Sequence, residues 1–174
     1  SMVNAQPPHG GYLKTERMAI HAAMVESIDR SLAQCMAALE KAGQHDNTLI
    51  LVLSDNGASH QMAFDNGKVP DGVRPGSADS FLNQGPEVAA LNNTPLRNYK
   101  LSDYEGGTAS PLVAWWPRGL KDKRRITDRL THIADIMPTC LELAGVTHPN
   151  QFERRDVIPL DGKSFVGTLR AEDE

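Results

Sequence analysis

Two stretches of the sequence carry side chains that could bind a cation and an anion. In the first, Ser54, Asp55 and Asn56 directly follow the apolar run 49–53, and Gly57 lets the chain turn away at once. A carboxylate and a side-chain amide on adjacent residues offer two hard oxygen ligands, which suit calcium or magnesium better than zinc. The same tripeptide recurs at 65–67 without a preceding apolar run, so a plain turn is the alternative interpretation.

The second stretch contains Lys100, which is followed by the glycine pair Gly106 and Gly107. A lysine ammonium is a compact point charge with three donors and fits one oxygen of a tetrahedral anion. The glycine pair allows the backbone to approach closely. The alternative is a solvated surface lysine, and these residues alone do not decide between the two.

A helix and a strand are predicted to position the first stretch. Apolar residues recur with a helical period from about Glu16 to Ala42, and Gly43 stands where such a helix would end. The run 49–53 then predicts a strand buried on both faces, as parallel strands in layered α/β folds are. Ligands in such sheets bind outside the carboxyl ends of the strands, which is where Asp55 lies.

The rest of the chain contains a long loop and two further elements. Residues 54–110 are rich in Gly, Pro, Asn and Asp, and a loop of this length usually carries function. Residues 111–117 predict a second strand. Residues 135–144 predict a helix that is capped by Asp135 and ended by Gly145.

We predict one main domain over residues 15–170, preceded by a flexible lead-in or linker over 1–14 and followed by a tail over 171–174. The 174 residues carry a formal net charge of -4, so there is no basic field to attract nucleic acid or an anionic membrane surface. No apolar stretch is long enough to span a membrane. Cys35 and Cys140 lie in apolar helical patterns, and we expect both to be core thiols.

Eight short motifs follow one another along the chain: Asp55–Gly57, Thr94–Arg97, Tyr99–Lys100, Tyr104–Gly107, Trp116–Pro117, His132–Thr139, Leu143–Gly145 and Ile158–Ser164. In order and spacing, over about Arg17 to Leu169, they resemble the second half of the arylsulfatase-type sulfatases. The resemblance implies an α/β fold similar to alkaline phosphatase, with three α/β/α layers, of which this chain would hold the C-terminal part and a partial sheet.

The resemblance also implies a chemistry. Enzymes of this family hydrolyse sulfate esters, on small molecules or on sulfated glycans, with a divalent metal and a formylglycine made from Cys or Ser in a C/S-x-P-x-R motif. Asp55 and Asn56 match the family's late metal ligands, for calcium or magnesium, and Lys100 matches the lysine that contacts the sulfate. The family resemblance alone suggests a secreted or periplasmic location, and the compartment stays open.

The catalytic nucleophile is absent from this sequence. No C/S-x-P-x-R motif occurs, because the similarly spaced segment 93–97 has asparagine in the nucleophile position. The family's early Asp-Asp metal ligands are absent too. We therefore expect a C-terminal portion of a sulfatase that binds calcium weakly or not at all and hydrolyses nothing alone. The alternatives are a non-catalytic binding or structural module on this scaffold and a phosphoesterase of the alkaline phosphatase superfamily. An exposed sheet edge predicts a homodimer.

Other residues near these motifs are predicted to have structural roles. We expect His60 and His132 to be structural, Arg97 to pair with a local carboxylate, Glu105 to stabilise a turn, and the pair Trp115-Trp116 to pack against a sheet. The segment 77–91 is predicted to line the mouth of the pocket.

Overall fold

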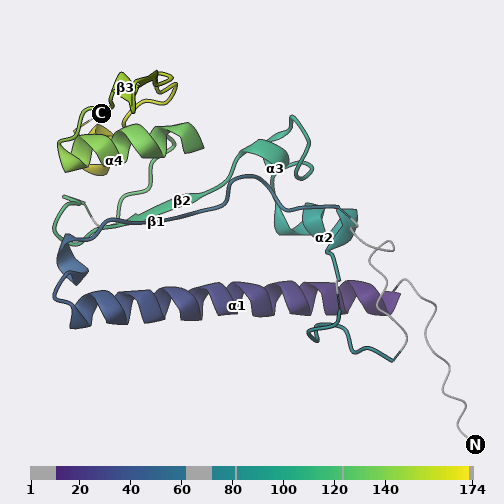
Figure 1. Ribbon diagram of the computed structural model, residues 1–174. Coiled ribbons are helices and arrows are strands. Elements are labelled where there is room, and N and C mark those ends of the chain that lie inside the picture. Colours follow the sequence, from purple (N-terminus) through teal and green to yellow (C-terminus); the bar gives the residue numbers. More distant parts are fainter. Residues whose placement is uncertain (1–10, 62–71, 81, 123, 173–174) are drawn as a thin grey trace, which may run out of the picture. The chain divides into compact units, whose positions relative to one another are not determined.

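The computed structural model describes residues 11–61, 72–80, 82–122 and 124–172, and Figure 1 shows their helices and strands. The chain divides into two compact units. Unit 1 comprises residues 1–38 and 53–112, and unit 2 comprises residues 39–52 and 113–174. Most of the predicted lead-in, residues 1–10, lies outside the described residues, as do residues 173–174 of the predicted tail.

The predicted long helix is present as α1 (Gly11–Lys41). It ends where the sequence indicates, because Gly43 has a φ of 66° and its N–H donates to the carbonyl oxygen of Glu40 at 2.9 Å. It begins earlier than predicted. Residues 11–14 belong to the helix and not to the lead-in, since the residues after Gly11 are compatible with helical backbone.

The apolar face of α1 is only partly covered by the described chain. Met24, Val25 and Ile28 are 61%, 52% and 61% exposed. Cys35 on this helix is exposed, and so is Cys140 in unit 2. The prediction that both cysteines are core thiols is therefore wrong. An apolar helical period marks the face that a helix can bury, but burial also needs a neighbouring element to cover it.

Both predicted strands are present, and they pair with each other in a two-stranded sheet. They are β1 (Ile50–Leu53) and β2 (Leu112–Trp115). Two backbone hydrogen bonds flank the pair, from Arg118 N–H to Asp46 O at 2.9 Å and from Gly57 N–H to Gly107 O at 3.0 Å. Residues that follow β1 thus bond to residues that precede β2, which is the arrangement of antiparallel strands.

The prediction that β1 is buried on both faces is wrong for the described chain. Val52 and Leu53 are each 37% exposed. An unbroken apolar run is typical of a strand inside a larger parallel sheet, but here the described neighbour of β1 is β2 alone, and it is antiparallel. A two-stranded sheet leaves side chains on both of its faces open to solvent.

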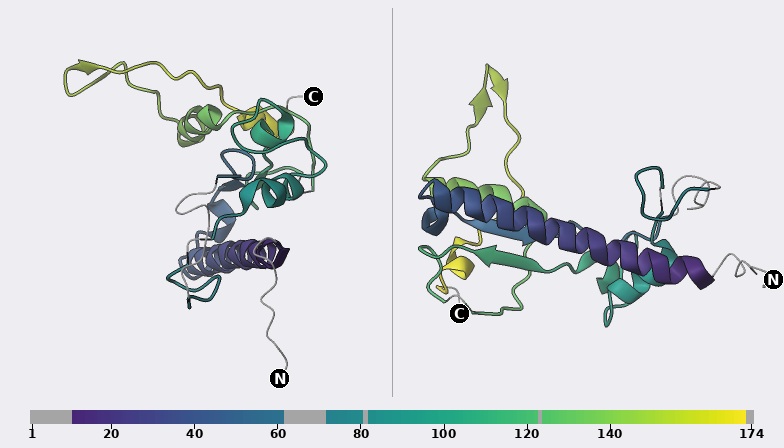
Figure 2. Two further views of the ribbon diagram at one scale, coloured as in Figure 1. Left: turned by 90° about the vertical axis from the view of Figure 1, so that its right-hand side faces the viewer. Right: turned by 90° about the horizontal axis from the view of Figure 1, so that it is seen from below.

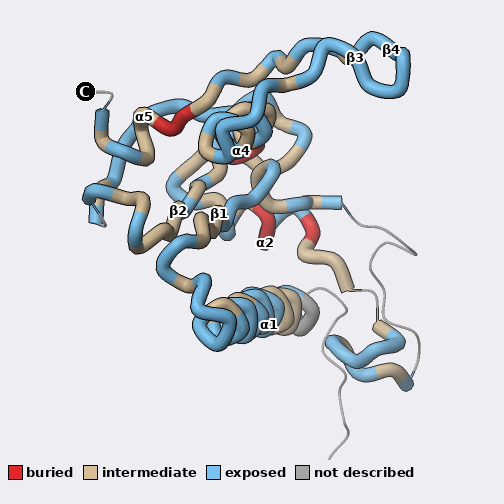
Figure 3. Tube along the Cα trace, turned by 60° about the vertical axis from the view of Figure 1, so that its left-hand side comes forward, coloured by how far each residue is buried: buried red, intermediate tan, exposed pale blue. Residues whose placement is uncertain are grey.

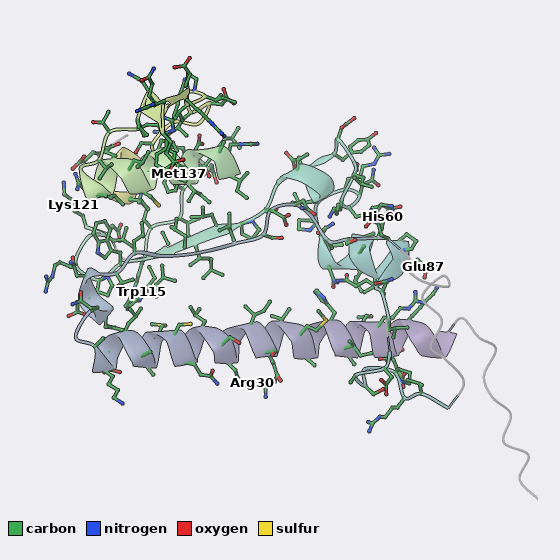
Figure 4. All side chains as sticks on the ribbon, viewed as in Figure 1. Arg30, His60, Glu87, Trp115, Lys121 and Met137 are labelled. Atoms are coloured by element: carbon green, nitrogen blue, oxygen red, sulfur yellow. The ribbon has the colours of Figure 1, made fainter. Side chains whose placement is uncertain are left out.

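The predicted loop over residues 54–110 contains two helices, α2 (Gly85–Asn92) and α3 (Glu105–Thr108). The sequence showed α2 only as a small apolar island, because a helix this short buries too few residues to reveal its period. Its buried residues are Gly85, Val88 and Ala89. Within unit 1, α2 lies beside the N-terminal part of α1, and Glu87 (Figure 4) forms an ion pair with Lys14 there.

Unit 2 contains the predicted second helix as α4 (Ile136–Ala144), which ends at Gly145 with a φ of 65°. The hairpin of β3 (Gln151–Phe152) and β4 (Arg155–Asp156) was not predicted from the sequence, and it extends away from α4 in both views of Figure 2. The remaining short elements are η1 (His45–Asn47), η3 (Ile133–Asp135) and α5 (Val166–Leu169).

Burial is concentrated in one small group of residues in each unit (Figure 3). In unit 1 the group belongs to α2 and α3, and in unit 2 it comprises Thr139, Phe165 and Val166. Among the described residues, no helix combines the length and apolar character that a membrane span requires.

Candidate functional site

The strand-end loop, residues 54–58, carries both predicted metal ligands. Asp55 is exposed and Asn56 is half-buried. The hydroxyl of Ser54 donates to the carbonyl oxygen of Asn56 at 2.8 Å, which closes a tight turn directly after β1. The local interpretations of a turn and of a ligand pair are thus compatible, because the turn exposes the side chains that follow the strand.

The lysine loop, residues 96–102, lies against the strand-end loop. The N–H of Lys100 donates to the carbonyl oxygen of Ala58 at 3.0 Å. Asn98 and Leu101 have φ angles of 66° and 71°, so the backbone bends sharply on both sides of Lys100. The structure therefore brings together the two loops that the sequence singled out separately.

Asn93, which the sequence analysis did not select, joins these two loops to α3. Its Oδ1 accepts the N–H of Ala58 at 3.1 Å. Its Nδ2 donates to the carbonyl oxygens of Asn98 at 2.9 Å and Gly106 at 2.8 Å. The partners are 35, 5 and 13 positions away in the sequence, so no periodic pattern of neighbouring residues predicts these hydrogen bonds. The only sequence signal was an asparagine placed just before Thr-Pro.

Two glycines make this close approach possible. A Cβ on Gly57 would overlap the carbonyl oxygen of Gly106, and a Cβ on Gly106 would overlap the carbonyl oxygens of Arg97 and Asn98. Gly106 N–H in turn donates to Arg97 O at 2.8 Å. The strand-end loop, the lysine loop and α3 thus pack backbone against backbone, which only residues without a side chain allow.

Aromatic contacts brace the same region. The ring of His60 (Figure 4) stacks on Tyr99, next to Lys100, with a centroid distance of 4.4 Å and an interplanar angle of 27°. The guanidinium of Arg97 lies 4.2 Å from the ring centroid of Tyr104. Among the described residues, the partner found for the Arg97 guanidinium is thus the Tyr104 ring, in a cation–π contact, and not the predicted carboxylate.

The donor set of the strand-end loop fits calcium or magnesium in kind but not in number. The side chains of Asp55 and Asn56 supply oxygen donors, and the Asp55 carboxylate is exposed and open to a cation. Among the described residues, no group of three or more His, Cys, Asp or Glu side chains is arranged to hold a metal. Calcium takes six to eight oxygens, so this pair can provide only part of a metal site.

The predicted helix cap Asp135 completes the capping box of η3 in unit 2 and also bonds to a distant backbone segment. It stands at the N-cap position of α4 but makes no side-chain cap bond there. Its carboxylate accepts the N–H of Lys163 at 2.7 Å and the N–H of His132 at 2.8 Å. These two bonds, that from Lys163 first, lower the pKa of Asp135 below its ordinary value of 3.8. His132 caps η3, in agreement with its predicted structural role.

The other predicted residues lie outside the two loops or support them. Trp115 packs edge-on against His45 at 4.5 Å within unit 2. Glu105 begins α3, and its carbonyl oxygen accepts the N–H of Ala109 at 2.8 Å. A cavity of about 410 Å³ in unit 1 is lined by α1 and by residues 74–77, but by neither Asp55 nor Lys100. Of the described residues in the segment 77–91, only Ser77 lines this cavity.

Comparison with known proteins gives a consistent set of relatives. Residues 4–146 match the Sulfatase family. The chain is 33% identical over 164 residues to an uncharacterized sulfatase of Schizosaccharomyces pombe, covering 86% of this chain and 29% of that protein. It is 28% identical over 157 residues to an arylsulfatase of Klebsiella aerogenes, covering 85% and 34%. It is 29% identical over 158 residues to the human N-acetylgalactosamine-6-sulfatase, covering 91% and 24%.

The matched region includes Asp55, Asn56, Asn93 and Lys100. The chain spans between 24% and 34% of the length of these three relatives.

Proposed function

Because this chain belongs to the sulfatase family, we propose that its strand-end loop and lysine loop form part of the active site of a sulfate-ester hydrolase. In this proposal Asp55 and Asn56 are ligands of a divalent metal, calcium or magnesium, and Lys100 contacts the sulfate group. The observation that carries it is the backbone hydrogen bond from Lys100 to Ala58, at 3.0 Å. This bond joins the loop whose side chains would bind the cation to the loop whose lysine would bind the anion.

The spacing along the chain suits a shared small ligand. Asn56 is two residues from Ala58, and two extended residues span at most about 7 Å. Lys100 is bonded to Ala58 directly and carries its charge on a long, flexible stem. A sulfate ester has several oxygens on one sulfur, so one oxygen can approach the metal ligands while another receives the lysine ammonium.

Each residue has a binding or orienting role in this proposal. Asp55 and Asn56 hold the cation, whose positive charge would polarise the sulfate oxygens. Lys100 offsets negative charge at a sulfate oxygen through a charge-assisted hydrogen bond. The ring of His60 stacks on Tyr99 of the lysine loop, next to Lys100, and braces that loop.

We propose that the formylglycine nucleophile and the remaining metal ligands come from a segment outside these 174 residues. The sequence contains no C/S-x-P-x-R motif, and two oxygen ligands do not complete a calcium site. The same segment would complete the sheet of the alkaline phosphatase-like three-layer α/β/α fold that family membership implies. On this proposal the isolated chain binds calcium with a Kd of about a millimolar or weaker and does not hydrolyse sulfate esters.

The test is a nuclear magnetic resonance titration of the whole chain with calcium chloride and, separately, with para-nitrophenyl sulfate. We expect calcium to shift the amide signals of Asp55 and Asn56, and the sulfate ester to shift that of Lys100. Asp55→Ala should abolish the calcium response, and Lys100→Met should abolish the sulfate response. No para-nitrophenol should be released.

Asp103→Ala is the matched control, because Asp103 is also an exposed aspartate of unit 1 but lies outside the strand-end loop. This variant should keep both responses. Calcium shifts that avoid Asp55 and Asn56, or sulfate shifts centred away from Lys100, would refute the assignment of these residues. Turnover of para-nitrophenyl sulfate by the chain alone would refute the external nucleophile.

A further inference from the structure

The side chain of Asn93 holds the strand-end loop and the lysine loop in a fixed relation. Its single carboxamide bonds to Ala58 in the first loop, to Asn98 in the second and to Gly106 in α3. The position of its oxygen and nitrogen follows from the partners, because one is an N–H and two are carbonyl oxygens. Both N–H donors and the oxygen of the amide are in use.

Few side chains of this size can replace that carboxamide. An aspartate carboxylate has the same shape but accepts only, so it would face two carbonyl oxygens with no proton to give. A serine hydroxyl has one donor and cannot serve both carbonyl oxygens. The geometry therefore requires an asparagine for a reason that is separate from any contact with a ligand.

Ala58 is the point at which the two loops are clamped. Its N–H donates to Asn93, and its carbonyl oxygen accepts the N–H of Lys100. Both hydrogen-bonding groups of this residue are therefore committed to the lysine side of the site. Because Ala58 lies two residues after Asn56, any movement of Ala58 changes the distance between the metal ligands and the lysine.

We propose that Asn93 is a positioning residue, which sets the spacing between the Asp55-Asn56 pair and Lys100 so that both contact the same sulfate group. The inference rests on the function proposed above and adds a residue that contacts neither metal nor substrate. A purely structural asparagine would stabilise unit 1 equally well. Only the positioning role predicts that replacing Asn93 changes the factor by which calcium strengthens the binding of the sulfate ester.

The experiment measures that mutual effect in the whole chain. The affinity for para-nitrophenyl sulfate is determined from the Lys100 amide signal, with and without excess calcium. In the unmodified chain calcium should strengthen sulfate binding by about fivefold or more, because both ligands meet at one site. In Asn93→Ala the ratio should fall to about one, while the calcium response of Asp55 and Asn56 persists.

Asn92→Ala is the matched control. Asn92 is the neighbouring asparagine, and its amide donates to Gln84 Oε1 at 2.7 Å, away from both loops. The Asn92→Ala variant should bind the sulfate ester more tightly with calcium by the same factor as the unmodified chain. If Asn93→Ala does not fold, Asn93→Asp is the second variant, because it keeps the size of the side chain and the acceptor for Ala58. In Asn93→Asp, too, calcium should no longer strengthen the binding of the sulfate ester.

The outcomes separate this inference from the proposed function. An unchanged ratio in a folded Asn93 variant overturns the positioning role, and so does unfolding of unit 1 in both Asn93 variants, which would make the residue structural. A ratio of about one in the unmodified chain, with both separate responses present, overturns the positioning role alone. Absence of both responses in the unmodified chain overturns the proposed function and this inference with it.

Discussion

Asn93 in unit 1 and Asp135 in unit 2 both tie distant backbone segments together, but with opposite hydrogen-bonding chemistry. Asn93 donates to two carbonyl oxygens and accepts one N–H. The Asp135 carboxylate accepts two N–H groups and donates nothing. Each works beside a glycine in close backbone contact, Gly106 in unit 1 and Gly162 in unit 2, where a Cβ would overlap a carbonyl oxygen.

The segments that the two side chains join differ in what they carry. In unit 2, Asp135 and Thr139 fasten the chain around Phe165 to the start of α4, since the Thr139 hydroxyl accepts the N–H of Phe165 at 3.0 Å. This covers a small apolar group. In unit 1, Asn93 joins the loops of the proposed ligands. A neutral carboxamide adds no charge beside a site that has to balance a cation and an anion.

The largest expected effect comes from filling the space at the glycines. Gly106→Ala and Gly162→Ala should each lower the free energy of unfolding by about 3 kcal/mol, because the new methyl group meets backbone that cannot move aside. Amide hydrogen exchange should show the damage in separate places, over residues 93–108 for Gly106→Ala and over residues 132–145 for Gly162→Ala.

Gly43→Ala is the control for the glycine variants. Gly43 has a positive φ of 66° but open space around its Cβ position. Its replacement should cost only about 1 kcal/mol, from backbone strain alone. If all three variants lost equal stability, backbone strain and not close packing would explain the result, and the proposed similarity between Gly106 and Gly162 would be lost.

Exchanging the two polar side chains tests their opposite chemistry. Asn93→Asp and Asp135→Asn keep the shape of the side chain. The first places a carboxylate oxygen against a carbonyl oxygen, and the second places an amide N–H₂ against a backbone N–H. Both should lower the free energy of unfolding by about 2 kcal/mol at neutral pH, because polar groups lose their hydrogen bonds. Urea unfolding, followed by amide signals from each unit separately, measures the loss.

Both variants should be less destabilised relative to the unmodified chain in acid than at neutral pH, but for different reasons. Asp135 has a lowered pKa in the folded chain, so its stabilisation is complete above the ordinary value of 3.8 and is lost as pH falls from there through the lower folded pKa. Asp135→Asn should remove that acid-dependent loss. Asn93→Asp should instead regain stability in acid, where the new carboxyl can carry a proton and donate it. For either variant, a stability loss that stayed the same from neutral to acid pH would contradict the comparison.

The smallest effect is expected from the exposed ion pairs, one in each unit. Lys14 pairs with Glu87 in unit 1, and Lys121 pairs with Glu172 at 3.2 Å in unit 2. All four side chains are at least 49% exposed. Lys14→Met and Lys121→Met should each change the free energy of unfolding by less than about 0.5 kcal/mol, and less still in high salt. A larger loss would mean that these exposed pairs stabilise each unit as much as the hydrogen bonds of Asn93 and Asp135 do.

Local patterns in the sequence were sufficient for the main elements. The helical period and Gly43 located α1 and its end, and the apolar runs located β1 and β2. These features depend on neighbours a few positions away. The family pattern, which requires only residue types in order, was also visible without coordinates, and the match over residues 4–146 supports it.

The burial of side chains and their hydrogen-bond partners could not be predicted from such local patterns. Cys35 stands in an apolar period but is exposed, since burial depends on what covers the helix. Asp135 was predicted to cap a helix, and its carboxylate completes the capping box of η3, but it also accepts the N–H of Lys163, which is 28 positions away.

By itself, the sequence determined which residue types stand where chemistry is predicted: an aspartate and an asparagine after a strand, a lysine in a glycine-rich loop, and no nucleophile motif within these 174 residues. Only the tertiary structure decided that these residues share one region, because Lys100 bonds to Ala58 and both loops bond to Asn93. The physical reason is that hydrogen bonds between distant segments leave no periodic trace along the chain. They form only when the whole unit has folded.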